Sequence, residues 1–319
     1  MSRIAILGAG AFGTALAVAL SRSGRQVVLW ARDPADMEAR RENRARLPGV
    51  RFPDALAVTG EIDEALDSTG PVLIAVPMQE LAGFLLAQAR HLDGRTLVAC
   101  CKGIDLGSGL GPIGLIRAAC PQAVAAIVSG PGFAADLAAG LPTALTLGCD
   151  IPAATDLQAL LSGDTLRLYL SADLAGVEIG GALKNVIAIA CGIVIGAGLG
   201  ESARAALLTR GYAEMVRYAV ARGASERTLA GLSGLGDLVL TATSEKSRNY
   251  RHGLAIGAGR TTDPGVTVEG VATTFALAAV GKAEDIGLPV TETLAGVLSG
   301  RRSVAEAVRE LLSRPLKPE

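Results

Sequence analysis

A glycine-rich turn close to the first residue constrains the fold of this chain more than any other feature. The run Gly8-Ala9-Gly10-Ala11-Phe12-Gly13 directly follows the apolar stretch RIAIL (residues 3–7) and precedes the helix-forming TALAVALS. A second apolar stretch, QVVLW (residues 26–30), completes a strand–helix–strand unit within about 30 residues. In such a unit the glycines permit a tight turn, close approach to a pyrophosphate and close helix packing, in that order. The run therefore predicts a dinucleotide site at the start of a helix, with a purely structural turn as the alternative.

Short apolar runs alternate with helical stretches through the first half of the chain. Besides the two already given, the predicted strands are residues 72–76, 96–99, 124–128, 143–147 and 165–170. Most of these runs are almost continuously apolar, which is typical of parallel strands that are covered on both faces. The pattern predicts an α/β fold, a Rossmann-like doubly wound sheet with right-handed crossovers.

The pattern changes after Ser171, and no further strand is predicted. The predicted helices are residues 173–195, 202–221, 248–256, 268–286 and 304–312. Ser171 or Asp173 is the expected cap of the first of these helices. We therefore predict a nucleotide-binding domain over residues 1–172 and an all-α domain over residues 173–319.

Charge, cysteine content and hydropathy exclude several other classes of protein. Residues 1–172 hold 14 basic and 16 acidic residues and residues 173–319 hold 16 and 15, so no nucleic-acid partner is expected. Five cysteines without a CxxC pair are typical of buried thiols in a reducing compartment, and no metal site is expected. Residues 185–200 lack charge but are shorter than the roughly 20 residues that a membrane span needs. We predict a buried core helix there and no stable membrane insertion.

The residues that follow the second predicted strand bear on the choice of nucleotide. An acidic residue at this place accepts a hydrogen bond from the ribose 2′-hydroxyl of NAD, whereas an arginine accommodates the 2′-phosphate of NADP. Here Arg32 precedes Asp33. This order favours NADP and leaves NAD open, and a solvated arginine before a turn at Pro34 is the remaining alternative.

Proton-transfer groups are scarce, because the chain has only two histidines and five lysines. His91 is predicted at the surface, and His252 lies on the same predicted helix face as Arg248. Lys184 is surrounded by alanine and aliphatic residues. Burial would lower the pKa of this lysine from about 10.4 toward neutrality, which suits proton exchange with an alkoxide. The alternatives are a lysine that snorkels to the surface and one that neutralises Glu178.

Two loops that follow predicted strands hold candidates for ligand contact. Lys102 follows strand 96–99, and the loop SGPGFA (residues 129–134) follows strand 124–128. Ligands of open α/β sheets bind beyond the carboxyl ends of the strands. Lys102 is therefore a candidate cation for an anionic ligand, and the loop glycines permit close backbone approach. A solvated loop lysine is the alternative.

A glycine-rich loop and a short polar run stand out in the second half. The loop GLSGLGD ends at Asp237, and Ser247, Arg248 and Asn249 follow one another at a predicted helix start. A hydroxyl, a guanidinium and an amide beside free helix N–H groups would bind a phosphate well. The alternatives are a helix cap at Asp237 and a second cap with an exposed arginine.

Taken in order, these stretches resemble the bacterial type of NAD(P)-dependent sn-glycerol-3-phosphate dehydrogenase over essentially the whole chain. The matching stretches are GAGAFGTALA, WARD, AVPMQ, CCKGI, SGPGFA, GALKNVIAIA, GLGDLVLTATSEKSRN and VEG. The resemblance implies a cytoplasmic oxidoreductase that interconverts dihydroxyacetone phosphate and sn-glycerol 3-phosphate with NADP or NAD and supplies phospholipid synthesis. It makes residues 1–172 the NAD(P)-binding domain and residues 173–319 the substrate-binding and catalytic domain, and it allows a homodimer.

The resemblance also implies roles for individual residues. Lys184 matches the proton-transfer residue, and we expect Asp237 to be the carboxylate that orients it. The expected cofactor-binding residues are Gly8, Gly10, Ala11, Phe12, Gly13, Arg32, Lys102, Ala134, Arg248, Thr267 and Glu269. The expected substrate-binding residues are Lys102, Gly130, Gly132, Lys184, Asp237, Ser247, Arg248 and Asn249. Gly132 stands where the family usually has serine, which removes a hydroxyl but keeps the backbone donors.

Two competing interpretations remain at this point. The first is another two-domain dehydrogenase that acts on a β-hydroxy acid or a sugar derivative. The polar run at residues 247–249 and the Gly-Asp loop favour a small phosphorylated ketone instead. The second is a nucleotide-sensing module without catalysis, against which the presence of Lys184, Asp237 and Arg248 argues.

Overall fold

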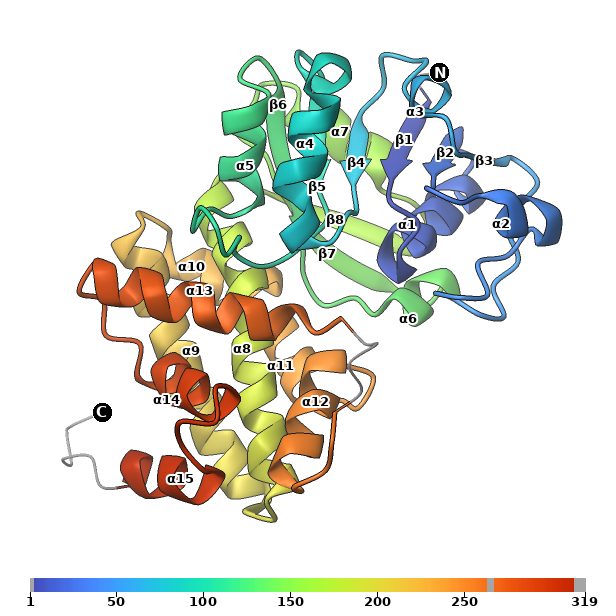
Figure 1. The fold of residues 1–319 in the computed structure, drawn as a ribbon. Coiled ribbons are helices and arrows are strands. Elements are labelled where there is room, and N and C mark those ends of the chain that lie inside the picture. The colour runs from blue at the N-terminus through green and yellow to red at the C-terminus, as the bar shows by residue number, and fades with distance from the viewer. Residues whose placement is uncertain (1–2, 263–266, 313–319) are drawn as a thin grey trace.

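The apolar runs of the first half pair into one mostly parallel sheet. A computed structural model describes residues 3–262 and 267–312. In these residues the sheet has eight strands in the order β3-β2-β1-β4-β5-β6-β7-β8 (Figure 1). The strands are β1 (Ile4–Leu7), β2 (Val27–Trp30), β3 (Leu56–Thr59), β4 (Val72–Ile74), β5 (Thr96–Ala99), β6 (Val124–Ser129), β7 (Thr143–Gly148) and β8 (Leu166–Ser171). The predicted α/β class and Rossmann-like sheet are confirmed.

Helices cover both faces of the sheet and connect its strands. They are α1 (Ala11–Arg22), α2 (Ala35–Arg40), α3 (Ile62–Ala65), α4 (Met78–Leu92), α5 (Pro112–Ala119), α6 (Ala134–Ala138) and α7 (Ala154–Leu161). Because alternate residues of a strand face opposite sides, Ile4 and Ile6 enter one apolar cluster while Ala5 and Leu7 enter another. The sheet therefore has a buried core on each face.

Two features of the sheet differ from the prediction. Strand β3 was not predicted: its four residues include the exposed Ala57, as an edge strand allows, and so lack a continuous apolar run. Strand β7 runs antiparallel to β6, with Val128 opposite Leu147. The 13 residues between these strands (130–142) hold only the five-residue α6, whereas the crossover between parallel strands usually contains a longer helix. Strand β8 then returns parallel to β7 through α7.

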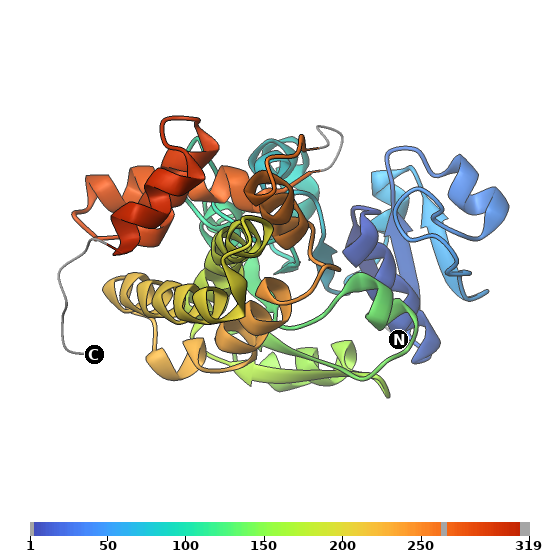
Figure 2. The same cartoon turned by 90° about the horizontal axis from the view of Figure 1, so that it is seen from below.

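The second half is helical, as predicted, with α8 (Leu174–Gly196) at its centre. The elements that follow are α9 (Gly200–Ala221), α10 (Glu226–Leu229), the π-helical turn η1 (Leu232–Gly236), α11 (Asp237–Ala242), α12 (Arg248–Gly257), α13 (Glu269–Ala283), α14 (Pro289–Leu298) and α15 (Val304–Leu312). Figure 2 shows α9, α12 and α13 grouped around α8. The short elements α10 and η1, and also α14, were missed, because short or glycine-rich stretches and a proline do not predict helix. Helix α11 corresponds to the helix that the alternative of a cap at Asp237 implied.

Helix α8 is the structural core of the second half and also reaches the sheet. Its cap is Asp173, one of the two predicted caps, whose side chain accepts a 2.8 Å hydrogen bond from Gly176 N. Among the described residues, α8 is long and apolar enough to cross a membrane, but 83% of its most apolar 18-residue stretch is buried inside the structure. Near its start, Val177 packs into the apolar cluster of the sheet. The predicted core helix is thus confirmed, and it connects the two halves.

Candidate active site

The first glycine turn lies where β1 ends and α1 begins. Gly8 has a φ of +114°, and a side chain there would meet the Ala75 carbonyl at 2.8 Å. Gly13 packs against Gly8 even more closely, because an added Cβ would lie 2.2 Å from the Gly8 oxygen. Gly10 caps α1 without a side-chain hydrogen bond and has open space where a Cβ would be. The turn therefore presents free N–H groups to an open region, which fits a pyrophosphate.

The residues beyond β2 lie in the open. Arg32 is exposed over 80% of its side chain, and its Nη2 lies 3.7 Å from Glu80 Oε2 at the start of α4. Asp33 is also exposed. Strand β2 lies beside β1, so Arg32 follows the strand next to the glycine turn. This is the place where the ribose of a bound dinucleotide is read.

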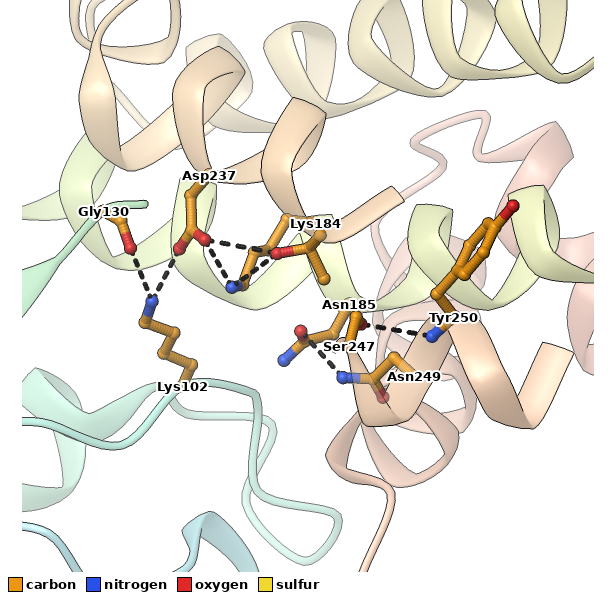
Figure 3. A network of polar contacts seen from close by, with 9 residues as sticks. Lys102, Gly130, Lys184, Asn185, Asp237, Ser247, Asn249 and Tyr250 are labelled. Atoms are coloured by element: carbon orange, nitrogen blue, oxygen red, sulfur yellow. Dashed lines mark hydrogen bonds and ion pairs between the residues drawn. The ribbon is translucent and has the colours of Figure 1, made fainter. Parts of the chain in front are cut away.

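A second site is built from three charged side chains that are far apart in sequence (Figure 3). Asp237 is 1% exposed and lies between two ammonium groups: Oδ1 is 2.6 Å from Lys184 Nζ, and Oδ2 is 2.6 Å from Lys102 Nζ. Lys102 Nζ also donates to the Gly130 carbonyl at 3.2 Å, and Lys184 Nζ donates to Thr241 Oγ1 at 3.0 Å. One carboxylate thus bridges both predicted lysines.

Each member of this cluster is placed by a different element. Lys102 extends from the loop after β5, Lys184 lies in the middle of α8, and Asp237 opens α11 directly after η1. Gly181, one turn before Lys184, lets the sheet approach α8: an added Cβ would lie 2.5 Å from Ser129 Oγ. The same Cβ would lie 3.4 Å from Lys102 Cγ, so the stem of this lysine passes over the glycine.

The structure excludes three of the alternatives left open by the sequence. Lys102 is not a solvated loop lysine, because its side chain is 14% exposed and ion-paired. Glu178 is not the partner of Lys184; its carboxylate accepts a 2.7 Å hydrogen bond from Ile113 N at the start of α5. Asp237 does not cap α11, since it makes no capping hydrogen bond there and its oxygens contact the lysines instead.

Burial and mutual charge set the protonation of this cluster. Burial of the Lys184 ammonium lowers its pKa to about 8, although Asp237 opposes the shift. Burial alone would raise the pKa of Asp237, but Lys102 and Lys184 outweigh it and hold the pKa below its usual value. A lysine with a pKa near 8 holds its proton at neutral pH and can also release it.

A second carboxylate, Glu269 at the start of α13, completes the charge pattern. Burial raises the pKa of Glu269, while the positive charges of Arg248, Lys102 and Lys184 oppose this shift. With both carboxylates ionised, the three cations leave one net positive charge, and protonation of Glu269 raises it to two. Such a surplus suits an anionic ligand.

The polar run at the start of α12 lies next to this charge cluster. Ser247 caps the helix and accepts from Tyr250 N at 3.2 Å, and Arg248 is exposed, as in the alternative of a cap with an exposed arginine. The Asn249 side chain donates to Asn185 Oδ1 at 2.9 Å and accepts from Gly270 N at 3.0 Å. Since Asn185 follows Lys184 and Gly270 follows Glu269, Asn249 connects α12 to both α8 and α13.

The remaining predicted residues lie around these two groups. Gly130 has a φ of +143°, and a Cβ on Gly132 would lie 3.2 Å from side-chain carbons of Leu145 and Thr143. Ala134 opens α6. Thr267, just before α13, is exposed. In the described residues no hydrogen bond or ion pair links the lysine cluster to Ala11, Phe12, Arg32, Ala134 or Thr267.

Two residues of the cluster were not singled out from the sequence. Thr241 donates to Asp237 Oδ1 at 3.3 Å and accepts from Lys184, and Asn185 holds Asn249. Thr241 lies four residues after Asp237, so in the helix that the cap alternative implied, the spacing places both residues on one face. Asn185 gave no signal other than its place beside Lys184.

The other titratable and metal-ligating groups lie elsewhere. His91 Nδ1 is 3.2 Å from Asp63, and His252 is half-buried on α12, where burial lowers its pKa. The five cysteines are buried and free, as predicted. Within residues 3–262 and 267–312, no group of three or more His, Cys, Asp or Glu side chains is arranged to hold a metal ion.

Comparison with known proteins matches both halves of the chain to one protein family. The family models for the NAD-dependent glycerol-3-phosphate dehydrogenase N-terminus and C-terminus match residues 3–155 and 173–309, respectively. The chain is 58% identical to glycerol-3-phosphate dehydrogenase [NAD(P)+] of Ruegeria sp. and 56% identical to that of Cereibacter sphaeroides, over 99% or more of each chain. The crystal structure of glycerol-3-phosphate dehydrogenase from Coxiella burnetii superposes with a TM-score of 0.93, at 36% identity over 98% of this chain and 99% of that one.

Proposed function

The chain belongs to the NAD-dependent glycerol-3-phosphate dehydrogenase family, and from this premise we propose that it interconverts dihydroxyacetone phosphate and sn-glycerol 3-phosphate with NADP or NAD. The observation that supports this activity best is the bridged cluster of Lys102, Asp237 and Lys184. It combines a lysine suited to proton transfer with a surplus of positive charge suited to a phosphorylated ligand.

The cofactor would bind across the β1 end. Gly8, Gly10, Ala11, Phe12 and Gly13 would hold the pyrophosphate and Arg32 the adenosine ribose, while Lys102, Ala134, Arg248, Thr267 and Glu269 would contact the nicotinamide half. When bound, the nicotinamide ring supplies the hydride for the reduction and accepts it in the oxidation.

The chain's own residues perform the binding and the proton transfer in this proposal. Arg248, Asn249 and the backbone at the start of α12 bind the substrate phosphate, because a guanidinium fork and free N–H groups suit its oxygens. Lys184 donates its proton to the C2 oxygen of the ketone and removes it from the alcohol in the reverse direction. Asp237 fixes the position of the Lys184 ammonium, and Lys102 adds positive charge beside the substrate.

We assign substrate contacts to Gly130 and Gly132 because the loop that holds them contacts Lys102 through Gly130. Gly130 presents its carbonyl to Lys102 Nζ at 3.2 Å. A Cβ at Gly132 would lie 3.2 Å from side-chain carbons of Thr143 and Leu145, so a serine there would need these side chains to shift slightly. We assign to Gly132 a contact through its backbone, since glycine has no hydroxyl to offer.

Domain division, location and assembly follow the same reasoning. We place the domain boundary near residue 172, immediately before the cap of α8, with the NAD(P)-binding domain before it and the substrate-binding and catalytic domain after it. A buried α8 and five buried thiols support a cytoplasmic protein without stable membrane insertion. Supply of glycerol 3-phosphate for phospholipid synthesis and a homodimeric assembly are further parts of the proposal.

One experiment tests the activity and the role of Lys184 together. Oxidation of NADPH and of NADH is followed in parallel with dihydroxyacetone phosphate, a β-keto acid and no substrate. We expect turnover with dihydroxyacetone phosphate, and a Lys184→Ala variant should lose about 10²–10⁴-fold in kcat, as expected for loss of a general acid. The dissociation constant for NADPH should stay within about twofold of wild type, since proton transfer rather than cofactor binding is removed.

The matched control is Lys282→Ala, which removes an exposed lysine on α13. It should keep wild-type turnover. Wild-type turnover in Lys184→Ala would refute the assigned role, and activity with the β-keto acid alone would favour the other class of dehydrogenase. Nucleotide binding without turnover on any phosphorylated ketone would favour a sensing module.

A further inference from the structure

Two opposite charges meet at the end of the sheet where a dinucleotide's ribose is read. Strands β2 and β4 both lie beside β1 in parallel, so the segments after them leave the sheet at the same edge. Arg32 lies two residues beyond the end of β2, and Glu80 lies in the first turn of α4 after β4. The Trp30 and Phe84 rings, 5.7 Å apart, pack the middle of α4 against the end of β2. The Arg32–Glu80 ion pair at 3.7 Å thus joins the two segments on either side of β1.

A nucleotide bound at the glycine turn would extend toward this ion pair. The segment after β4 approaches the turn so closely that a Cβ on Gly8 would meet Ala75. A pyrophosphate at the start of α1 directs its adenosine toward the end of β2, where the group at the ribose 2′ position is read. The Glu80 carboxylate therefore lies beside the guanidinium that would meet a 2′-phosphate.

We propose that Glu80 is a specificity-determining residue that weakens the preference of this enzyme for NADP over NAD. The Glu80 carboxylate competes with the 2′-phosphate for Arg32. It also repels the phosphate, because both groups are negatively charged. A 2′-hydroxyl has no charge, so binding of NAD does not experience this repulsion. The inference rests on the proposed function, because it takes Arg32 as the reader of the ribose.

The exposure of both side chains decides how strong this effect is. Arg32 is 80% and Glu80 53% exposed, so water and salt screen the pair, and an incoming phosphate can displace the carboxylate. The phosphate has nearly two negative charges, against one on the Glu80 carboxylate, and three acceptor oxygens. It also pairs with arginine in a bidentate geometry. Glu80 therefore reduces the affinity for NADP without excluding it, and Asp33 next to Arg32 adds to the same negative potential.

The test measures nucleotide affinity on the full-length protein rather than turnover. Dissociation constants for NADPH and NADH are determined by fluorescence titration for wild type and for Glu80→Gln. We expect Glu80→Gln to bind NADPH about three- to tenfold more tightly at low ionic strength, because one charge beside the phosphate is removed. The affinity for NADH should change by less than about twofold, and 0.5 M salt should largely abolish the NADPH effect.

The matched control is Asp156→Asn, which removes one exposed carboxylate from α7 beside β8, at the opposite edge of the sheet. It should change neither constant, and Arg32→Ala should abolish the discrimination between the two nucleotides. Equal shifts for NADPH and NADH in Glu80→Gln, or no shift in either, would overturn the inference. If the wild-type protein binds neither nucleotide, the proposed cofactor site fails and the inference with it.

Discussion

Two carboxylates close to α8 are both withdrawn from water, yet their acidity changes in opposite directions. Asp237 lies between the Lys102 and Lys184 ammonium groups, and its pKa falls. Glu178, near the start of α8, accepts a hydrogen bond from Ile113 N, and the exposed Arg117 is the one cation that lowers its pKa among the described residues. Burial raises the pKa of Glu178 to about 7, against the smaller effects of that hydrogen bond and of Arg117.

The comparison shows that burial alone does not define an active-site carboxylate here. A buried acid without an adjacent cation keeps its proton near neutral pH, whereas one between two ammonium groups stays ionised. Asp237 therefore stays ionised while Lys184, with a pKa of about 8, gains and loses its proton. Glu178 instead contributes a hydrogen bond between the two halves, and its charge depends on pH.

Among the substitutions that test this difference between Asp237 and Glu178, we expect Asp237→Asn to have the largest effect on stability and turnover. The substitution leaves Lys102 and Lys184 facing each other without a counter-charge. Breaking a buried ion pair costs about 3–5 kcal/mol of unfolding free energy, and misplacing a proton donor costs about 10²–10⁴-fold in turnover. Urea unfolding and kcat for dihydroxyacetone phosphate reduction measure the two effects.

Asp136→Asn is the control for this substitution, because it breaks the more exposed ion pair with Lys246. It should change stability by at most about 1 kcal/mol and leave turnover unaffected. Wild-type turnover in Asp237→Asn would show that Lys184 does not need the carboxylate.

The pH dependence of the two reaction directions gives the next largest effect. Reduction of the ketone needs the protonated Lys184 ammonium, whose pKa is about 8. Its kcat should therefore decrease about tenfold per pH unit above pH 8, while the oxidation, which needs the neutral amine, should decrease likewise below pH 8. Steady-state rates in both directions between pH 6 and 10 test this, and parallel profiles would contradict it.

Glu178→Gln should give the smallest change in activity but a distinct change in stability. The folded-state pKa of Glu178, about 7, lies above its ordinary value of 4.5, so the folded protein holds this proton more tightly than the unfolded chain. Ionisation therefore removes stability as pH rises from 4.5 through 7, by up to about 3 kcal/mol. Glutamine cannot ionise, so the variant should gain stability relative to wild type between pH 5 and pH 8.

Urea unfolding at several pH values measures this difference, with Glu38→Gln, an exposed site on α2, as the control. The control should show no such trend. A constant difference between wild type and Glu178→Gln from pH 5 to pH 8 would show that Glu178 does not titrate in this range.

Local patterns predicted the parts of the site that lie within single elements. The glycine turn, the buried Lys184 and the cap at Ser247 each depend on neighbours close in sequence. The contacts of Asp237 could not be predicted from residues alone, because they join positions 53 and 135 residues apart. Strand β3 and the direction of β7 also escaped prediction, since a short edge strand lacks an apolar run and strand direction depends on how the chain crosses the sheet.

The bridge made by the Asp237 carboxylate also limits which halves of related chains can be recombined during evolution. One of its lysines comes from the sheet half and the other from the helical half, so neither half contains the whole cluster. A hybrid that joins the sheet half of one relative to the helical half of another keeps the bridge only if its β5 loop supplies a lysine of the right reach. The two halves must therefore match at this bridge, although each has its own apolar core.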